Sequence, residues 1–372
     1  MPETASSINL YFDNQPAAAD RLALFRQVRI DQAIGMAAEA ELEMEIGVDA
    51  SGNWTGVEED FVQPFKRVRV EVRIRQNDPV ALIDGPIVGQ RFEMSAAPNQ
   101  SKMVLIVQDD SVLLNQEEQV AIFEDQSADQ IASGLFQQAG LTAETDSVPA
   151  ASGGLTRYTV QRGTAMQLVR ELARQNGLFA YVRPGDTPGS SVGVFKRPDL
   201  ADAGYPVLIP VGERRNMDRF SAEFDGLRPL QARADNVDLT NQELLSSSAE
   251  ASDLNTQGDM AAHQMVSAGK ALLARTGAAT VELDAATQSA VNLSSWAYSA
   301  SGEVVADSYS GVLRPYKTVA VSGAGGYLSG QWLITKVEHV INESGYRQHF
   351  NLRRNARAGG SGSGGGIPGG IF

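Results

Sequence analysis

The sequence predicts an α+β protein that is mostly β, with two similar small β-barrel domains separated by an α+β module. Three observations lead to this prediction. Apolar and polar residues alternate over short runs in both halves of the chain, two segments near the middle carry helix-capping signals, and turn residues separate the runs. Period-two alternation bounded by glycine, proline or asparagine is typical of half-buried antiparallel strands.

Length and composition exclude several classes of protein. A chain of 372 residues is long enough for two or three domains with their own cores. It contains no cysteine, which excludes disulfides and thiolate metal sites. No apolar run reaches the ~18 residues of a membrane span, and the first residues lack the pattern of a secretory signal. We therefore expect a protein that is made and left in the cytoplasm unless another machine exports it.

The formal net charge of −14 argues against tight binding to nucleic acid, which requires clustered lysine and arginine. The acidic balance has two interpretations. It provides solubility alone, or it forms a surface past which polyanions slide without binding. The second interpretation becomes important only if the protein forms a channel.

Residues 1–20 are expected to form an N-terminal arm, and residues 21–118 the first β-barrel domain. Ala38–Val48 places its apolar residues on one face and four glutamates on the other. Lys66–Arg75 has the clearest strand pattern, with valines facing inward and arginines outward. Opposite charges on neighbouring strands stabilise a sheet by roughly 0.2–1 kcal/mol per pair, so we expect the glutamate row to pair with the arginine row. An acidic lumen and a phosphate site are the alternatives.

Residues 119–203 are expected to form the α+β middle domain. Ser127 and Gln130 have the spacing of a capping box, in which each side chain bonds the backbone N–H of the other end of the turn. An apolar stripe follows, and Gly140 ends the helix. Thr164–Gln167 repeats the capping signal before a second stripe, and a strand follows this second helix directly.

Residues 204–358 are expected to form the second β-barrel domain, with a helical insertion near 252–276. Asp259–Arg275 has a composition that favours helix. Thr280–Leu283 and Ser295–Tyr298 are expected to be strands.

The second domain closes with Val319–Arg354, which reads as three short strands joined by two turns. Its large aromatic residues are Trp332, Tyr346 and Phe350. We expect these rings to pack within the barrel or against a neighbouring subunit. No nucleophile or phosphate loop occurs in this stretch.

Residues 359–372 form a glycine-rich tail that ends in apolar residues. Glycine-rich segments behave as flexible tethers. Ile367, Ile371 and Phe372 are therefore candidate partner-binding residues at the end of a tether. The alternative is a disordered tail without a partner.

The chain carries no recognisable catalytic, cofactor or metal motif. Its three histidines are His263, His339 and His349, and none has the spacing of a zinc site. Glu338 and His339 fall on opposite faces of a strand and cannot act together. We predict no enzyme activity, no cofactor and no metal, although so acidic a chain does not exclude a glycan-cleaving carboxylate pair.

The segment Tyr327–Arg354 resembles the closing segment of the phage late-control protein D family. These proteins are baseplate hubs of contractile phage tails and are also similar to the hub part of type VI secretion spike proteins. Phe123–Leu141 and Met166–Val182 resemble two further phrases of the family, and the ordered set spans roughly residues 100–355. The matching positions near the end are Gly330, Leu333, Ile334, Val337, His339, Gly345, Tyr346 and Arg353.

Two departures from the family pattern are visible. Thr164–Gln167 stands where the family often has Asp-Trp-Glu. No spike domain follows residue 355, and we therefore expect the spike tip to be a separate protein.

The resemblance implies a homotrimer in which two similar barrels per chain build a pseudo-sixfold ring between the sixfold tail tube and the threefold central spike. It implies tail tube or tube-initiator, spike, wedge and tape measure proteins as partners, with DNA or cargo passing without specific binding and without membrane insertion. The place would be a virion or injection-particle baseplate, assembled in the host cytoplasm. A secreted or surface polysaccharide-binding or -cleaving β protein is the main alternative, and a membrane or pilus adaptor is a third.

Overall fold

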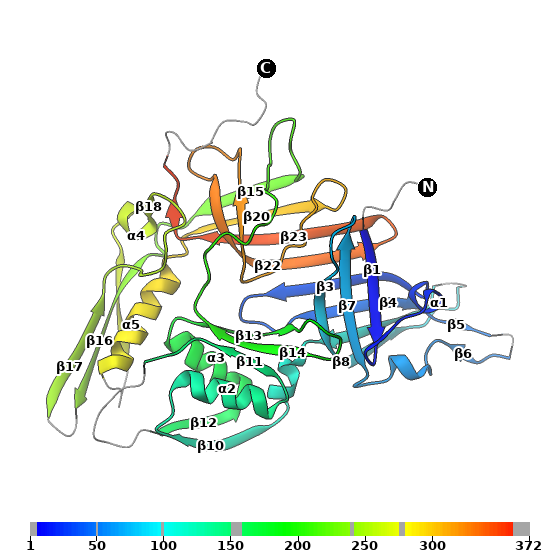
Figure 1. Ribbon diagram of the computed structural model, residues 1–372, viewed down its shortest axis with the longest axis horizontal. Coiled ribbons are helices and arrows are strands. Elements are labelled where there is room, and N and C mark those ends of the chain that lie inside the picture. Colours follow the sequence, from blue (N-terminus) through cyan, green and yellow to red (C-terminus); the bar gives the residue numbers. More distant parts are fainter. Residues whose placement is uncertain are drawn as a thin grey trace.

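One twelve-stranded antiparallel sheet organises the protein, as the computed structural model shows (Figure 1). The structure describes residues 6–49, 51–97, 100–149, 158–238, 242–274 and 280–359. In spatial order the strands are β15 (Arg219–Phe224), β20 (Tyr298–Val305), β23 (Gly345–Arg354), β22 (Gly330–Asn342), β3 (Phe25–Ala33), β4 (Glu39–Glu45), β9 (Lys102–Gln108), β8 (Val80–Glu93), β7 (Arg67–Ile74), β1 (Ser6–Phe12) and β2 (Gln15–Pro16), with β21 (Thr318–Val321) beside β22.

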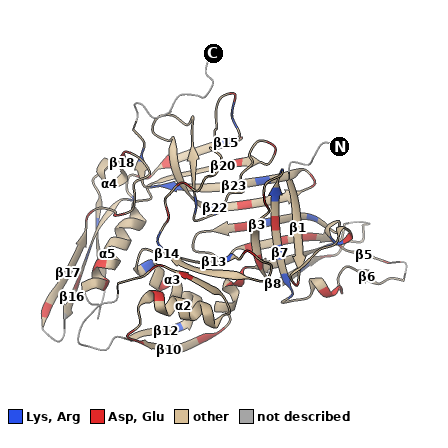
Figure 2. Cartoon of the chain, viewed as in Figure 1, with Lys and Arg blue, Asp and Glu red and all other residues tan. Residues whose placement is uncertain are grey.

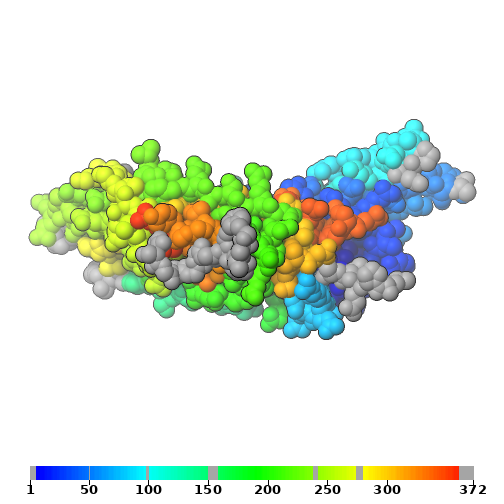
Figure 3. Space-filling view, turned by 90° about the horizontal axis from the view of Figure 1, so that it is seen from above, coloured from blue at the N-terminus to red at the C-terminus, as the bar shows by residue number. Residues whose placement is uncertain are grey.

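The two predicted β units are joined into this single sheet by the pairing of β3 with β22. Their register runs from Ala33 opposite Lys336 to Gln27 opposite Asn342. We call this pairing the seam. Seen from above, the orange C-terminal strands lie between the green and yellow end of the elongated molecule and its blue end (Figure 3). Among the described residues the sheet path is open at both ends, so no barrel is closed within one chain.

The structure confirms the two helices predicted in the middle module. They are α2 (Ala128–Gln138) and α3 (Ala165–Gln175), and both begin with a complete capping box. Three short strands pack on these helices as β11 (Thr142–Thr145), β14 (Ser191–Lys196) and β13 (Phe179–Pro184). On the other side lies a two-stranded sheet of β10 (Glu118–Glu124) and β12 (Tyr158–Thr164).

The prediction for residues 259–283 is wrong in two places. The expected helix Asp259–Arg275 is replaced by β18 (Met260–Ala261), the one-turn α4 (Ala262–Met265) and β19 (Gly269–Ala274). Strand β19 runs parallel to β16 (Leu230–Asp238), which also pairs with β17 (Glu243–Ala249). Backbone pairing with β16 therefore overrides the helix propensity of this segment.

The expected strand Thr280–Leu283 is the first turn of the helix α5 (Thr280–Ser294). This helix buries Leu283, Ala286 and Val291, and Val291 packs on alanines of β16 and β17. The apolar residues recur at helical spacing once the whole segment is considered. The remaining elements are α1 (Ala19–Leu22), β5 (Gly47–Val48), β6 (Trp54–Thr55), β24 (Ala356–Arg357) and the 3-10 helices Asp60–Val62 and Asp110–Leu114.

Each large part of the chain has its own apolar cluster. One lies under the first β unit, one between the helices and strands of the middle module, and one under the second β unit. Trp332, Tyr346 and Phe350 are all buried within the chain, which confirms packing inside the subunit for these rings. Tyr346 comes from β23 but joins the cluster of the first unit, so the two cores meet beneath the seam.

Candidate assembly surfaces

One face of the central sheet is charged, whereas the opposite face packs on the apolar clusters. Along β4 the glutamates are half-buried and the intervening Ala40, Leu42 and Met44 are buried. The same alternation continues through β3, β22 and β23, and Figure 2 shows the resulting mixture of charges along the strands. We call this surface the polar face, and its charged side chains include Arg29, Asp31, Glu39, Glu41, Glu43, Glu45, Arg91, Lys102, Glu303, Lys336, Glu338, Arg347 and His349.

Ion pairs connect neighbouring strands across the polar face. Arg29 Nε lies 2.5 Å from Glu338 Oε1, and Lys336 Nζ lies 3.1 Å from Asp31 Oδ1, so both pairs cross the seam. Half-exposed pairs of this kind contribute about 0–1 kcal/mol each. Their main effect is therefore on the register of the sheet rather than on its stability.

The predicted pairing between the glutamate row and the arginine row is wrong. Strands β9 and β8 lie between β4 and β7. Glu41 pairs instead with Arg91 at 2.9 Å, and Glu43 pairs with Lys102 at 3.0 Å. Glu45 contacts Arg26. Cations therefore do pair with three of the four glutamates, but they come from β3, β8 and β9 and not from the arginine row of β7.

A chain of buried polar groups lies directly beneath the seam. His339 Nδ1 lies 2.8 Å from the hydroxyl of Tyr346, and Nε2 lies 3.2 Å from Gln32 Oε1. Gln32 in turn donates a hydrogen bond of 2.6 Å to the carbonyl of Leu82. Burial lowers the pKa of His339 to about 3, so its imidazole is neutral at neutral pH. The histidine and tyrosine that carried the family resemblance therefore contact each other as structural groups.

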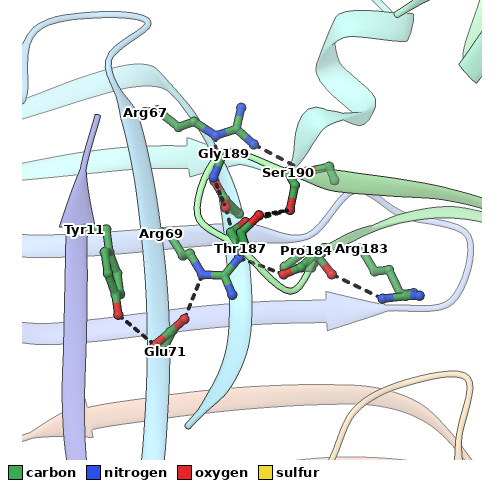
Figure 4. Close-up of polar contacts among 12 residues, drawn as sticks. Tyr11, Arg67, Arg69, Glu71, Arg183, Pro184, Thr187, Gly189 and Ser190 are labelled. Atoms are coloured by element: carbon green, nitrogen blue, oxygen red, sulfur yellow. Dashed lines mark hydrogen bonds and ion pairs between the residues drawn. The ribbon is translucent and has the colours of Figure 1, made fainter. Parts of the chain in front are cut away.

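A second buried polar cluster fastens the first β unit to the middle module (Figure 4). Asp84 of β8 is completely buried and receives Arg67 Nε at 2.7 Å and Arg69 Nη1 at 3.1 Å. The backbone N–H of Gly189, in the loop between β13 and β14, donates to the same carboxylate at 2.9 Å. We call this cluster the arginine joint.

Both arginines of the joint have further partners. Arg69 bonds Glu71 at 2.8 Å and the carbonyls of Gly185 and Thr187 at 2.9 and 3.2 Å. Arg67 contacts Asp110 through two hydrogen bonds of 2.6 and 3.0 Å. Burial opposes the charge of Arg67, but the hydrogen bonds and charges of Asp110 and Asp84 outweigh burial and raise the pKa of Arg67. The sequence placed both arginines on an outward face, but Arg69 is buried beneath the loop from the middle module and Arg67 is partly buried.

Arg354 forms a different buried site in the second β unit. Its guanidinium donates to the carbonyls of Ala356 at 2.6 Å and Ser329 at 3.0 Å, and it also contacts the carbonyl of Tyr327. Its Cζ lies 4.7 Å from the ring centre of Trp332 and 5.5 Å from that of Tyr298. Within the described residues no carboxylate pairs with it. Burial lowers the pKa of Arg354 to about 10.

The resemblance to the hub family assigned the terminal arginine of the motif to Arg353. The structure shows that Arg354 is fully buried and Arg353 is half-buried. The alternation along β23 places the two on opposite faces of the sheet, so only Arg354 can reach Trp332.

A cleft of about 350 Å³ lies where three parts of the chain meet. Its walls come from residues 32–38 and 81–82 of the first β unit, from β13 and β14 of the middle module, and from residues 314–317, which lead into β21. We call it the three-way cleft. Tyr316 stacks on Tyr181 with ring centres 3.6 Å apart, and its hydroxyl accepts a hydrogen bond of 3.0 Å from the N–H of Gly35.

Tyr316 connects all three walls of this cleft and has a φ of 67°, a left-handed conformation that is uncommon for a residue with a bulky side chain. Its stacking and hydrogen bond hold this conformation in place. The three-way cleft was not predicted from the sequence, because no single segment contributes more than part of it.

Other candidate surfaces are apolar or lie outside the described residues. Val120 and Ile122 of β10, with Tyr158 and Val160 of β12, form an exposed apolar face on the middle module. The predicted partner-binding residues of the tail are Ile367, Ile371 and Phe372, and all three lie outside the described residues. Among the described residues, no group of three acidic or histidine side chains is arranged to hold a metal ion, and none of the helices has the length and hydrophobicity to span a bilayer.

The chain belongs to the family described as the Alg8 N-terminal domain, whose model matches residues 15–343. That description states no activity. No curated protein sequence matches the chain.

Solved structures of tail proteins share the fold. The 43 kDa tail protein of prophage MuSo2 from Shewanella oneidensis is 16% identical, with a TM-score of 0.63 over 94% of this chain and 98% of that chain. A tail protein from Neisseria meningitidis is 13% identical, with a TM-score of 0.61 over 94% and 97%. The c3393 protein of E. coli, a component of the type VI secretion system, is 11% identical, with a TM-score of 0.53 over 89% and 73%. The predicted resemblance to tail baseplate and secretion spike proteins is therefore confirmed at the level of the fold.

Proposed function

We propose that this chain, which has the fold of phage tail proteins, is a structural subunit of the baseplate hub of a contractile phage tail or a related injection system. The open twelve-stranded sheet with one charged and one buried face is the observation that supports this role best. Such a sheet has the form of a segment of wall that is completed by further copies. No catalytic role is part of this function.

Three copies would form the hub ring. The first β unit, within residues 21–118, and the second, within residues 204–358, each contribute several strands to the sheet, and the middle domain of residues 119–203 packs against them. Among the described residues the sheet ends in β15 on one side and in the two-residue β2, which covers only the end of β1, on the other. Free sheet edges favour pairing with another chain. Two similar barrel-like units per chain would then give the ring its pseudo-sixfold symmetry.

The polar face is the proposed lining of the delivery channel. Its arginines and lysines pair with carboxylates, as in Arg91 with Glu41 and Arg347 with Glu303. A polyanion is held by clustered cations that are free to release counterions. DNA or another cargo would therefore pass along this surface without specific binding. A channel with strongly positive potential in an assembled particle would contradict this assignment.

The sixfold tail tube or a tube-initiator protein and the threefold spike are the proposed neighbours above and below the ring, with wedge and tape measure proteins beside and within it. The particle would be assembled in the host cytoplasm and the protein would reside in its baseplate. The tail of residues 359–372 is the proposed attachment for the spike or another neighbour, through Ile367, Ile371 and Phe372. Deleting it should weaken that attachment and leave the trimer intact, and unchanged co-purification would contradict this role.

The decisive experiment measures mass in solution and images the particle. We expect a mass three times that of one chain and a threefold density at the centre of the baseplate. The purified protein should leave glycans intact. A monomer that cleaves a polysaccharide would instead support a secreted or surface polysaccharide-acting protein.

A further inference from the structure

The three-way cleft gathers side chains with a consistent chemistry. Five cationic residues line it, from β13, from β14 and the residue after it, and from the segment before β21. They are Arg183, Lys196, Arg197, Arg314 and Lys317. This concentration of positive charge occurs in a chain with a net charge of −14.

The carboxylates in the cleft do not neutralise these cations. Glu144 is shared by Arg183 at 2.6 Å and Lys196 at 2.9 Å, so one negative charge faces two positive charges. Arg197, Arg314 and Lys317 are exposed, and none of them pairs with a carboxylate among the described residues. The cleft therefore has cations available for an incoming anion.

The remaining two carboxylates in the cleft are already engaged by backbone groups. Asp109 is buried and accepts hydrogen bonds from the N–H of Ala38 at 2.6 Å and of Ser111 at 2.9 Å. Asp199 is exposed and accepts from the N–H of Ala201 at 3.1 Å. After all three carboxylates are counted, positive charge is in excess, and charges that line a cleft focus their field on what enters it.

Apolar and aromatic groups also line the cleft. Met36 and Pro315 lie on the lining, and the stacked rings of Tyr181 and Tyr316 form a flat wall. A bare inorganic anion would leave these groups without a partner. The volume of about 350 Å³ is near the lower end of ligand pockets, which hold roughly 300–1,000 Å³. A few side chains of an extended peptide would fill it.

We propose that the three-way cleft binds an acidic segment of another protein, in which carboxylates contact the free cations and an apolar side chain packs on the tyrosine wall. Charge complementarity is what selects this partner: the cleft is positive, apolar in part and open to solvent at its cationic rim. Binding at this site does not depend on whether the chain forms a trimeric ring.

The test titrates the full chain with a short fluorescein-labelled peptide of alternating glutamate and leucine and follows fluorescence anisotropy. The double variant Arg314→Glu/Lys317→Glu should weaken binding by at least about tenfold, which corresponds to 1.4 kcal/mol. The matched control is Arg214→Glu/Arg215→Glu, which reverses the same charges at two exposed arginines outside the cleft and should bind as the wild type does. Arg197→Glu provides an independent cleft variant if the first one folds poorly.

A gain-of-binding variant sharpens the test. Glu144→Gln removes the carboxylate shared by Arg183 and Lys196, and it should tighten peptide binding, with a greater effect at low salt than at physiological ionic strength. Weaker or unchanged binding by this variant would overturn the proposed role of the cations.

Other outcomes decide against the cleft or its partner. Equal loss in the cleft and control variants would show non-specific attraction and overturn the site. Displacement of the peptide by inorganic phosphate or by a single-stranded oligonucleotide at the same concentration would overturn the choice of an acidic peptide. If the wild-type chain self-associates and the cleft variant does not, a second copy occupies the cleft and the assignment to another protein is wrong.

Discussion

The arginine joint and the Arg354 site bury the same kind of side chain in two different ways. At the joint, Arg67 and Arg69 face the buried carboxylate of Asp84, and charge is balanced by charge. At Arg354 the guanidinium is surrounded by backbone carbonyls and two aromatic rings, and the charge is spread over dipoles and ring faces.

The difference follows from what each site connects. The joint links strands of the first β unit to the loop of residues 184–191 in the middle module, so it holds two separately built parts together. Arg354 instead ties the end of β23 to the turn before β22 within one unit. Both members of each ion pair come from the first β unit, whereas the middle module contributes the carbonyls of Gly185 and Thr187 and the N–H of Gly189. The loop therefore packs on charges that are already balanced, and it adds hydrogen bonds without adding a charge.

The largest expected effect comes from the carboxylate of the joint. Asp84→Asn leaves Arg67 and Arg69 facing a neutral group, and breaking a buried ion pair costs about 3–5 kcal/mol. Denaturant unfolding of the full chain measures this loss. Asp60→Asn is the matched control, because Asp60 pairs with Lys66 but is exposed, and it should cost less than about 1 kcal/mol. Similar losses for the two variants would mean that charge balance is not what stabilises the joint.

Arg354→Met should have the second largest effect, a loss of about 2–3 kcal/mol. The substitution leaves the carbonyls of Ala356 and Ser329 without a hydrogen-bond donor, but it leaves no unpaired buried charge. An unsatisfied buried polar group costs about 1–3 kcal/mol. Arg354→Lys should recover only part of the loss, since one ammonium cannot reproduce the planar fork of a guanidinium. Unfolding midpoints measure both, with Arg353→Met as the half-buried control. If Arg354→Met lost as much stability as Asp84→Asn or more, the absence of an ion pair at Arg354 would not make that site less sensitive than the arginine joint.

His339 provides a third case, in which a titratable group is buried without charge. Its folded pKa is about 3 and its unfolded pKa about 6.5, so between these values the unfolded state binds more protons. The contribution of the neutral His339 to the free energy of unfolding is therefore fully present above pH 6.5. It decreases by about 1.4 kcal/mol per pH unit as the pH falls from 6.5 towards 3.

The pH dependence of unfolding, compared between the wild type and His339→Gln, isolates this contribution. Glutamine retains hydrogen-bonding groups near Tyr346 and Gln32 but cannot titrate. The wild type should lose stability relative to His339→Gln as the pH falls below 6.5. Parallel pH profiles would show that burial of the imidazole does not control this part of the acid sensitivity.

The smallest loss of stability is expected for the partly solvent-exposed ion pair between Arg29 and Glu338. Glu338→Gln breaks the ion pair with Arg29 on the polar face, where both side chains are partly solvated, and should cost less than about 1 kcal/mol. The loss should shrink further at high salt. Thermal unfolding at two ionic strengths measures it, and a loss comparable to that at Arg354 would indicate that the seam depends on its ion pairs.

Local patterns in the sequence predicted local structure well. The alternation of Lys66–Arg75 gives β7, with its valines buried, and the capping boxes at Ser127 and Thr164 begin α2 and α3. These features depend on neighbouring residues alone. Asp259–Arg275 fails because its strand β19 is stabilised by β16, which lies far away in the sequence.

The sites depend on contacts that no local pattern contains. Arg69 reads as an outward residue and becomes buried only because the loop of residues 184–191 covers it. The partners of Glu41 and Glu43 depend on the spatial order of β4, β9 and β8. The three-way cleft requires three distant segments to meet at Tyr316. The sequence shows which side chains are charged, whereas the spatial order of distant segments determines which opposite charges and backbone groups they contact.

The seam also determines when the protein can finish folding during synthesis. Arg29 and Glu338, which meet across it, are 309 residues apart in the chain. A ribosome adds ~5–20 residues per second, so β22 emerges roughly 15–60 s after β3. During that interval the inner edge of β3 has no strand to pair with, although β4 is already available on its other side. The nascent first unit must therefore wait with an open edge, and this is the stage at which a chaperone or a neighbouring nascent chain has the best access to it.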